Sequence, residues 1–565
     1  MPEISDFLKD LLIARGIQTP EETEIFLNPD YERDIHDPFL LTGMEKAVAR
    51  ILSAIEKKEK IVLFSDFDAD GIPAAVVMHD TLLKLGHTNF SVVIPHRNTE
   101  GFGLNDGVVA RAIEDKTNLL VTLDCGMGDA KYIEILQAGG VDVIVTDHHL
   151  PNHDVPEAFA IVNPNQAGDT YPNKYLCGAG VAFKIAQAIF YKLNQNQSPT
   201  SNFQPPTPIS KGWEKWLLDM VAIATLSDMV PLQGENRTLA YYGLLVLRKS
   251  PRIGIRTLCQ HLRLFQKNIT EDDVVFSITP RINAASRMDE PESAFELLST
   301  KSEARAEVLA THLENINKER KVAVAVMAKE VKQKLKDRAE GPVIVVGNPH
   351  WRPGLLGLVA TNVVESYSCS AFVWGRGDAK VIKGSCRSNG SVDVLALMNE
   401  AKDLFLEFGG HKKSGGFSIT VPNLALLPDA LSKAYERIHG TDKTSDDVVS
   451  GPILTLDDIS SGTFSDIQRL SPCGMGNEKP VFVFENVSVS KAETFGKEKG
   501  HVRLTFARDA GTMVNAIEFF SDESVKNISA GDTITLHATL ERDTFTRGQP
   551  IRLRIVDVIQ TELVT

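Results

Sequence analysis

Three apolar runs in the first third of the chain each end in acidic or imidazole side chains, and this pattern constrains the fold most. The runs IVLFS, LLVTL and VDVIVT are short enough for buried strands and alternate with helical segments, as in a parallel α/β sheet. They are followed by Asp66, Asp68 and Asp70, by Asp124, and by Asp147, His148 and His149. In an open parallel sheet, ligands bind outside the carboxyl ends of the strands. We therefore expect these side chains to meet at one edge of a sheet.

The side chains at this edge predict a divalent metal site. Closely spaced carboxylates repel one another unless cations neutralise them. Carboxylate and imidazole ligands without thiolate suit Mn²⁺ or Mg²⁺ better than structural zinc, and the six cysteines are scattered singly. Asp228, at the end of the apolar run AIATLS, adds a further acid. Because two cations about 3.5 to 4 Å apart can activate water and stabilise a phosphate ester under attack, the residues predict a metal-dependent phosphoesterase.

Composition and charge restrict the function classes. Of the 565 residues, 43% are hydrophobic and 24% are charged, which is typical of globular domains. No apolar run approaches the ~18 residues that span a bilayer, and the N-terminus lacks a secretory pattern, so a cytoplasmic protein without membrane contact is expected. The net charge of −14 argues against a general polyanion binder, whereas residues 341–420 hold eight basic against six acidic side chains. Any nucleic-acid contact is therefore expected to be local.

Changes of pattern along the chain predict its domains. We expect an N-terminal extension (1–42), a parallel-sheet α/β catalytic domain (43–240), a helical connector (241–340), a second α/β domain (341–440) and a β-rich domain (446–565). The connector ends in a helix between Ser302 and Glu340, which at 1.5 Å per residue would be about 55 Å long. The last domain has five β-like runs separated by turn signals. Such a pattern favours a small barrel of the OB type, a common platform for single-stranded nucleic acid.

The motifs, taken together and in order, resemble a known superfamily. They are DFDADG from Asp66, DCG from Asp124, DHH from Asp147 and GGH from Gly409, together with HRNTEGFGLN, LCGAGVAFK, SDMVPLQGENR, RINAASRMDE, KGSCRS and SPCGMGNEKP. This series resembles the DHH phosphoesterase superfamily and, within it, the RecJ family of single-strand-specific DNA exonucleases. The resemblance implies an α/β protein with a parallel-sheet DHH domain and a second α/β, DHH-associated domain. A long helix would join these two domains, and an OB-like β-barrel would follow at the C-terminus.

The resemblance also implies roles for individual residues. Two Mn²⁺ or Mg²⁺ ions would be held by Asp66, Asp68, Asp70, Asp124, His148 and Asp228. Asp124 would bridge the ions and, with His149 beside the reacting phosphate, would be catalytic. Guanidinium groups, hydroxyls and aromatic faces suit phosphates and bases. The implied phosphate- or DNA-binding residues are Arg97, Phe102, Arg281, Asn283, Ser385, Arg387, His350 and His411.

The implied activity is processive hydrolysis of single-stranded DNA in the 5′ to 3′ direction, releasing 5′-mononucleotides during DNA repair and recombination. Single-strand-binding protein and a RecQ-type helicase are the partners that the resemblance implies. Two alternatives stay open at this point. One is a DHH phosphatase acting on short oligonucleotides or pyrophosphate, which would not need the barrel or the long helix. The other is a non-catalytic replication scaffold, although such a protein would have no need of the acidic residues present here.

Overall fold

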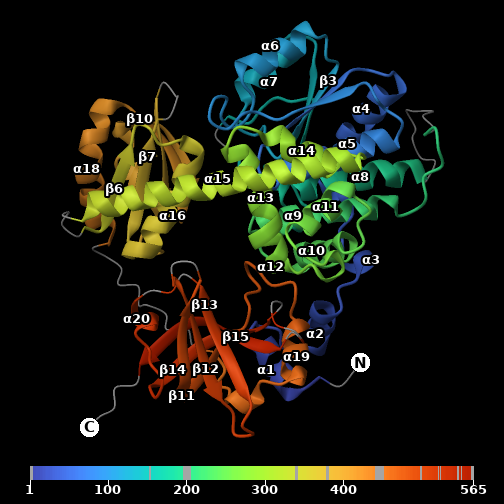
Figure 1. Cartoon of the computed structure of the whole chain (residues 1–565). Helices are drawn as coiled ribbons and strands as arrows, with labels where there is room; N and C mark the ends of the chain where they lie inside the picture. Colours follow the sequence, from blue (N-terminus) through green and yellow to red (C-terminus); the bar gives the residue numbers. More distant parts are fainter. Residues whose placement is uncertain are drawn as a thin grey trace. The chain divides into compact units, whose positions relative to one another are not determined.

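The computed structural model describes residues 4–560 apart from 152–153, 195–204, 337–340, 377–380, 440–450, 497–498, 520, 522, 544–545, 547 and 549. The chain forms two compact units (Figure 1). The first comprises Met1–Asp34, Pro231–Arg237 and Asp446–Thr565, and the second comprises Ile35–Val230 and Thr238–Ser445. Among the described helices, none is long and apolar enough to cross a membrane.

The second unit begins with a five-stranded sheet in which every neighbouring pair is parallel. Its strand order is β2-β1-β3-β4-β5, with β1 Ile61–Ser65, β2 Phe90–Val93, β3 Leu119–Leu123, β4 Asp142–Thr146 and β5 Ala160–Val162. The register places Ser65 beside Leu123 and Leu123 beside Thr146. The next residues, Asp66, Asp124 and Asp147, therefore start from one level at the carboxyl edge, as the sequence predicts.

Helices cover both faces of this sheet. They are α4 Met44–Glu56, α5 Gly71–Lys84, α6 Asp106–Glu114, α7 Ala130–Ala138, α8 Gly178–Asn194 and α9 Leu218–Ser227. The buried side chains of α6 and α7 share a core with β1, β3 and β4, and Figure 1 shows both helices beside β3. Helix α5 contacts β1, α8 and α9. Because α8 and α9 are buried along most of their length, they form a rigid base for the edge that carries the acids.

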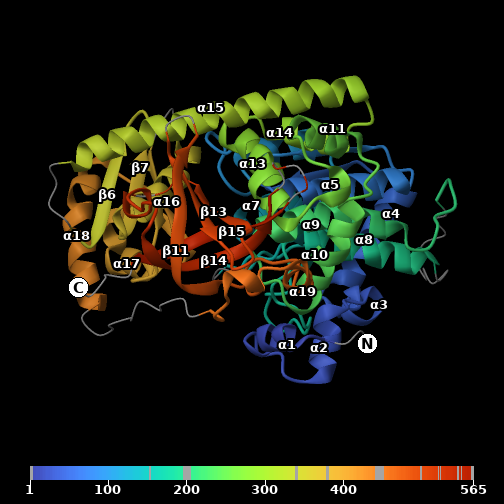
Figure 2. The same ribbon diagram turned by 60° about the horizontal axis from the view of Figure 1, so that its bottom comes forward.

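A helical segment follows. It contains α10 Gly234–Leu247, α11 Ile253–His261, α12 Glu271–Asp273, the π-helical turn η4 Val274–Ile278, α13 Thr279–Arg287, α14 Pro291–Ser299 and α15 Glu303–Leu335. Helix α15 has 33 residues and a length of about 50 Å, and Figure 2 shows it as one continuous helix. It contacts α11, α13 and α14. Its last turns pack Met327, Val331 and Leu335 into the core of the next domain. The expected long connecting helix is therefore present.

The second α/β domain has a five-stranded sheet of order β6-β7-β8-β10-β9. Its strands are β6 Val343–Asn348, β7 Ser370–Gly375, β8 Ile382–Arg387, β9 Phe405–His411 and β10 Ser414–Ile419, and its helices are α16 Leu356–Tyr367, α17 Val394–Glu400 and α18 Val421–His439. Only β6 and β7 pair in parallel within this described sheet. Helices α17 and α18 share one core with the sheet, and α16 shares a separate core with it and the end of α15.

The first unit is built around a closed five-stranded barrel of order β11-β12-β13-β15-β14. The strands are β11 Phe482–Phe495, β12 His501–Ala507, β13 Met513–Phe519, β14 Thr533–Arg542 and β15 Ile551–Gln560, and the flanking helices are α1 Asp6–Ile13, α2 Pro20–Leu27, α19 Ser461–Gln468 and α20 Glu523–Lys526. Leu8, Leu11 and Leu12 of α1 are buried in the same core as the barrel strands. The predicted α/β fold class with a C-terminal barrel is therefore confirmed, and α1 is part of the barrel's core.

Candidate metal centre

The loop between β1 and α5 holds three aspartates in different environments. Asp68 accepts hydrogen bonds from the backbone N–H of Asp70 at 2.8 Å and of Gly71 at 3.2 Å, which fixes the turn into α5. Asn283 reaches the same loop from α13 and accepts from the N–H of Ala69 at 2.9 Å. Asp66 and Asp70 are buried. The loop is thus held rigidly, with its carboxylates in a protected edge of the sheet.

Asp70 ties this loop to helix α8. Its two carboxylate oxygens accept from the N–H groups of Gly178 at 2.6 Å and Ala179 at 2.7 Å, at the start of that helix. The N-terminus of a helix favours a negative charge because its N–H groups lack partners within the helix. Asp124, buried after β3, lies against the same turn. A Cβ atom on residue 178 would lie 2.4 Å from the Cβ of Asp124, so only glycine fits there.

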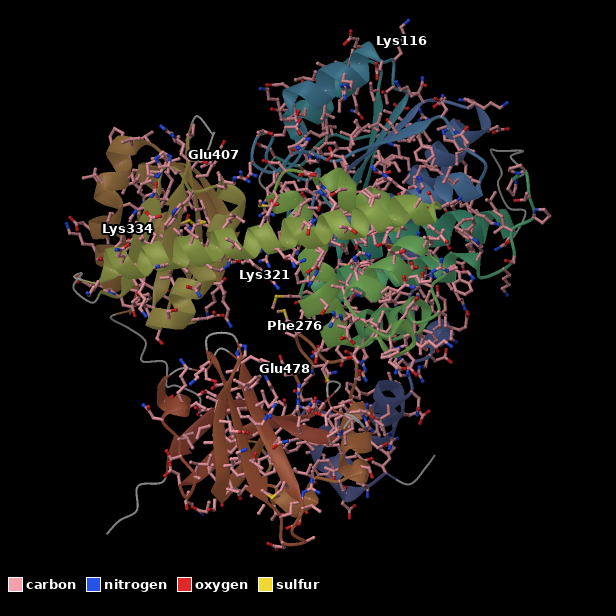
Figure 3. The ribbon with its side chains drawn as sticks, viewed as in Figure 1. Lys116, Phe276, Lys321, Lys334, Glu407 and Glu478 are labelled. Atoms are coloured by element: carbon pink, nitrogen blue, oxygen red, sulfur yellow. The ribbon has the colours of Figure 1, made fainter. Side chains whose placement is uncertain are left out.

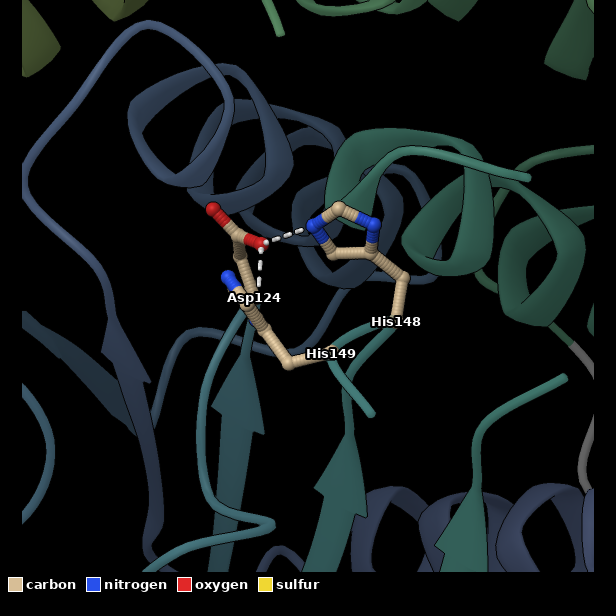
Figure 4. Close-up of side chains that lie close together, drawn as sticks. All are labelled: Asp124, His148 and His149. Carbon is tan, nitrogen blue, oxygen red and sulfur yellow. Dashed lines mark ion pairs between the residues drawn. The ribbon is translucent and has the colours of Figure 1, made fainter. Parts of the chain in front are cut away.

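The two histidines that follow β4 have different partners. Asp147 accepts from His149 Nδ1 at 2.7 Å and from the backbone N–H groups of both histidines, so it orients the pair. His148 Nε2 lies 3.2 Å from Asp124 Oδ1 and 3.7 Å from Asp228 Oδ2. Figure 4 shows Asp124 at the end of its strand with both imidazoles turned toward it.

All the predicted metal residues converge. Three groups have potential ligand atoms that lie within 4.8 Å of one another, and these groups are Asp66–Asp68–Asp124, Asp70–His148–Asp228 and Asp124–His148–His149. In two of the three, Asp124 is a member. Asp66 Oδ1 and Asp124 Oδ1 are buried and accept no hydrogen bond from the described residues. Buried polar atoms normally have partners, so the two orphaned oxygens fit a site built for cations.

The pKa values of the acids reflect their crowding. Burial, followed by repulsion from neighbouring aspartates, raises the pKa of Asp66 and Asp124 well above the ordinary range. The same causes raise the pKa of Asp70 to about 7 and that of Asp228 to about 9. Without cations the cluster would therefore retain protons at neutral pH. Divalent ions would replace those protons and let the carboxylates ionise.

The two imidazoles are pushed in opposite directions. Burial and the neighbouring His149 lower the pKa of His148 to about 4, so His148 is neutral and offers a lone pair. Burial also opposes charge on His149, but its hydrogen bond to Asp147 outweighs burial and raises the pKa of His149 to about 9. Neutral imidazole is the form that binds metals, and imidazolium is an acid. In the metal-free protein the two neighbouring rings therefore differ in their protonation.

Cationic and aromatic side chains lie next to the cluster. The Arg97 guanidinium stacks over the Phe67 ring at 4.8 Å, and Phe102, 55% exposed, packs edge-on against His149 at 5.6 Å between centroids. Arg287 was not predicted. Burial, then the nearby cations Arg97 and Arg320, lower the pKa of Arg287. An anion bound here would relieve that repulsion.

The second α/β domain contributes Ser385 and Arg387 from β8. Arg387 Nη1 donates to Ser385 Oγ at 3.2 Å. Burial lowers the pKa of Arg387, the neighbouring Cys386 raises it in part, and repulsion from Arg97 lowers it further. Gly354 bonds this domain to the loop after β2 and to helix α13. Gly354 donates its N–H to Asn98 Oδ1 at 2.8 Å, and its carbonyl accepts from Arg287 Nη1 at 2.7 Å.

Other predicted DNA-binding residues are engaged elsewhere. Arg281 donates to Glu314 of α15 at 2.9 Å and to the Ser277 carbonyl at 3.0 Å. Asn283 holds the aspartate loop. His350 and His411 are exposed, and within the described residues no hydrogen bond or ion pair links either to the acidic cluster. The other four of the eight predicted residues are not occupied in this way. They are Arg97, Phe102, Ser385 and Arg387.

Three family models match the chain in order, and their matches agree with the domains of the structure. They are the DHH family N-terminal domain over residues 60–225, the DHHA1 domain over 340–440 and the RecJ OB domain over 453–557. The parallel sheet with its acidic edge, the second α/β domain and the barrel thus define a DHH phosphoesterase with a C-terminal accessory domain.

Individual relatives narrow this class. The single-stranded-DNA-specific exonuclease RecJ of Bacillus subtilis is 32% identical over 99% of this chain and 68% of the relative. The RecJ exonuclease of Haemophilus influenzae is 31% identical over 91% of this chain and 89% of that relative. The crystal structure of RecJ in complex with Mn²⁺ from Thermus thermophilus has a TM-score of 0.79 at 25% identity, covering 98% of this chain and 76% of that one. The chain belongs to the RecJ family, which confirms the family predicted from its motifs.

Proposed function

We propose that this chain is a metal-dependent exonuclease that degrades single-stranded DNA processively from the 5′ end to 5′-mononucleotides, in DNA repair and recombination. The observation that carries the proposal is the convergence of seven acidic and imidazole side chains around two orphaned carboxylate oxygens. Relatives named as single-stranded-DNA-specific exonucleases support the substrate, and a related structure with Mn²⁺ supports the cofactor. None of these relatives favours a phosphatase of short oligonucleotides or pyrophosphate, or a scaffold.

The proposed cofactors are two Mn²⁺ or Mg²⁺ ions. Asp66, Asp68 and Asp124 would hold one, and Asp70, His148 and Asp228 would hold the other. Asp124 would contribute to both sites, because it belongs to the first group and its Oδ1 lies 3.2 Å from His148 Nε2 in the second. When bound, such ions activate the attacking water and stabilise the charge that develops on the phosphate oxygens.

His149 is the proposed proton donor. Its raised pKa, about 9, leaves the ring protonated at neutral pH, and its Nδ1–H donates to Asp147. The Nε2–H is then the group available to a phosphate oxygen. Because Asp147 also accepts from the N–H of Met127 at 3.0 Å, it is anchored on both sides and keeps the ring in place.

The substrate's 5′ end is proposed to meet the cationic side chains around Arg287. Arg97, Ser385 and Arg387 would bind the terminal phosphate, because guanidinium forks and hydroxyls complement phosphate oxygens. Phe102, exposed beside His149, would stack on a base. The remaining predicted residues, Arg281, Asn283, His350 and His411, would act less directly, through the α13 surface and the exposed loops of the second α/β domain.

Two partner proteins and a cellular compartment are also proposed. Single-strand-binding protein and a RecQ-type helicase would supply single strands to the enzyme. The cytoplasm is the proposed compartment, because all six cysteines lie in the described residues and are unpaired, as in a reducing environment.

End-blocked substrates test the activity. The full chain is incubated with Mn²⁺ and uniformly labelled single strands that carry a block at one end or the other. Rapid release of mononucleotides from strands blocked at the 3′ end, and none from strands blocked at the 5′ end, is expected. Asp124→Ala should abolish release and blunt duplex should resist digestion. Degradation that ignores a 5′ block would refute the direction, and activity in EDTA would refute the metal centre.

A further inference from the structure

Three arginines near the proposed phosphate site come from three separate segments of the chain. Arg97 lies in the loop after β2, Arg287 lies at the end of α13, and Arg387 lies in β8 of the second α/β domain. All three segments belong to the second compact unit. Burial lowers the pKa of Arg287 and of Arg387, and repulsion from Arg97 lowers both further. Cations that repel one another stay close only if other contacts hold their segments together.

Asn98, the residue after Arg97, bonds to the segment that follows α13. Its backbone N–H donates to Asp289 Oδ1 at 3.0 Å, and its Nδ2 donates to Asp289 Oδ2 at 2.7 Å. The same Nδ2 donates to the carbonyl of Arg287 at 3.3 Å. His96 Nδ1 donates to the carbonyl of Asp289 at 2.9 Å. The loop that carries Arg97 is therefore tied to the end of α13.

The side chain of Asn98 also reaches the second α/β domain. Its Oδ1 accepts from the backbone N–H of Gly354 at 2.8 Å, and the carbonyl of Gly354 accepts from Arg287 Nη1 at 2.7 Å. Gly354 lies in the short helical turn η5 Pro353–Leu355, directly before α16. A Cβ on residue 354 would lie 3.0 Å from both Asn98 Oδ1 and the carbonyl oxygen of Arg287. Glycine thus lets the turn lie close against these two residues.

The start of α16 connects this turn to the phosphate-binding side chains of the second domain. Gly357 lies on the first turn of α16, and a Cβ at this position would lie 3.0 Å from Arg387 Nη2 and 3.3 Å from Ser385 Oγ. Helix α16 also packs against β7 and β8. Because these parts are packed together, a shift of the turn at Gly354 would carry Ser385 and Arg387 with it.

Helix α15 holds the second domain at another place. Lys334, labelled in Figure 3, donates from the last turns of α15 to the carbonyl of Gly347 at 2.6 Å, and Glu330 accepts from Trp351 Nε1 at 3.0 Å. These two bonds join the domain to α15 but do not involve the loop that carries Arg97. The bond between Asn98 and Gly354 supplies a direct link from that loop to the second domain.

We propose that Asn98 is a positioning residue for the terminal phosphate of the substrate, because its side chain holds Arg97 at a fixed distance from Ser385 and Arg387. The phosphate then meets guanidinium groups whose spacing is set before it binds, and its negative charge offsets their repulsion. This inference rests on the proposed function, in which the terminal phosphate is the ligand of these side chains. It places the effect of Asn98 on recognition of the strand's end and not on metal binding.

The test compares single strands that carry a 5′-phosphate with the same strands that carry a 5′-hydroxyl, using the full chain and Mn²⁺. The measured quantity is the ratio of kcat/KM for the two kinds of strand. Asn98→Leu keeps the approximate size of the side chain but removes its donors and its acceptor. It should lower the ratio by about 10- to 100-fold, because a misplacement of about 1 Å can cost about 100-fold.

Two controls accompany this variant. Thr99→Val changes the exposed neighbour in the same loop and should keep the wild-type ratio. The Mn²⁺ affinity of Asn98→Leu, measured by titration calorimetry, should match that of the wild type, because none of the described hydrogen bonds of Asn98 involves the acidic cluster.

An exchange of side chains separates positioning from a general loss of stability. Asn98→Asp alone places two carboxylates against each other and should lower the ratio. When Asn98→Asp is combined with Asp289→Asn, the amide and the carboxylate change places. The hydrogen bond between the two side chains can then form in the reverse direction, and the acceptor for the N–H of Gly354 is kept. The double variant should therefore recover much of the ratio that Asn98→Asp loses, as expected for coupled residues.

The outcomes distinguish this inference from the proposed function. An unchanged ratio in Asn98→Leu, including an equal loss on both kinds of strand, would overturn the inference and leave the proposed function intact. A wild type that digests both kinds of strand equally would overturn the phosphate site and the inference, but not the metal-dependent hydrolysis. Absence of Mn²⁺-dependent digestion by the wild type would overturn the proposed function as well. If Asn98→Leu fails to fold by circular dichroism, the exchange variants and Gly354→Ala decide by the same ratio.

Discussion

Replacing Asp228 with Asn should stabilise the metal-free protein while it abolishes activity. The pKa of Asp228 is about 9 in the folded chain, through burial and the nearby Asp70, against 3.8 as its ordinary value. A carboxyl with a raised pKa keeps its proton in the folded state after the unfolded chain has lost it. Stability therefore falls as pH rises from about 4 to about 9, by at most about 1.4 kcal/mol per pH unit. Asn carries no such penalty.

The size of the effect follows from the same values. At pH 7 the penalty could reach about 4 kcal/mol, but the Asp228 side chain is 28% exposed and shares its protons with neighbouring acids, so we expect about 2 kcal/mol. With Mn²⁺ at a hundred times its dissociation constant, the wild type gains about 2.7 kcal/mol and the variant gains less. When metal is added, the difference in free energy of unfolding between Asp228→Asn and the wild type should therefore become smaller or change sign.

Urea denaturation followed by tryptophan fluorescence measures this directly, because Trp213, Trp216, Trp351 and Trp374 all lie in the unit that contains the cluster. The assay is run in EDTA and in Mn²⁺, at pH 5.5 and pH 8, with exposed Asp403→Asn as the matched control. The stabilisation by Asp228→Asn should be larger at pH 8. A variant less stable than the wild type in EDTA at both pH values would refute the reasoning.

Three further changes test other parts of the structure. His149→Gln should lower kcat about 10²- to 10⁴-fold in single-turnover digestion while Mn²⁺ affinity by calorimetry stays within a few-fold, because the ring acts as an acid; a lost metal affinity would make it a ligand instead. Phe102→Ala should weaken binding of an oligonucleotide by about 1 to 3 kcal/mol in fluorescence anisotropy. Phe102→Tyr should bind the oligonucleotide as tightly as the wild type, and equal affinity of the Ala variant and the wild type would show that the ring does not stack on a base. Leu12→Ala should destabilise the barrel unit by about 2 to 5 kcal/mol, seen as faster hydrogen exchange in β11 and β14 with tryptophan fluorescence unchanged; equal exchange would place α1 outside the core.

The acidic edge could be predicted because its geometry is local to each strand. A buried run followed by an acid places that acid at the strand end, and parallel pairing in register brings Asp66, Asp124 and Asp147 together without further information. Asp228 is different. It follows the helix α9 and not a strand, and its place in the cluster depends on how that helix packs. Its inclusion came from the resemblance, together with the apolar run that precedes it.

The cationic residues show where prediction from sequence stops. Arg281 and Arg287 stand in one motif, six positions apart on α13, and only Arg281 was predicted to bind phosphate. Arg281 pairs with Glu314, a residue of another helix, whereas Arg287 points among other cations. Only the packing of α13 against α15 distinguishes them. The same holds for α1, since the spacing of Leu8, Leu11 and Leu12 shows an apolar face but not what covers it.

The packing of α1 has a consequence for how the protein is made. Arg15, just after that helix, bonds to Asn477, 462 positions further along the chain. During translation the helix leaves the ribosome long before any barrel strand exists, so its leucines must stay uncovered, or be covered by a chaperone, until the barrel strands have been made. The core of the barrel unit therefore depends on a pairing between α1 and strands that begin only at Phe482, and contacts of such long range in sequence form slowly.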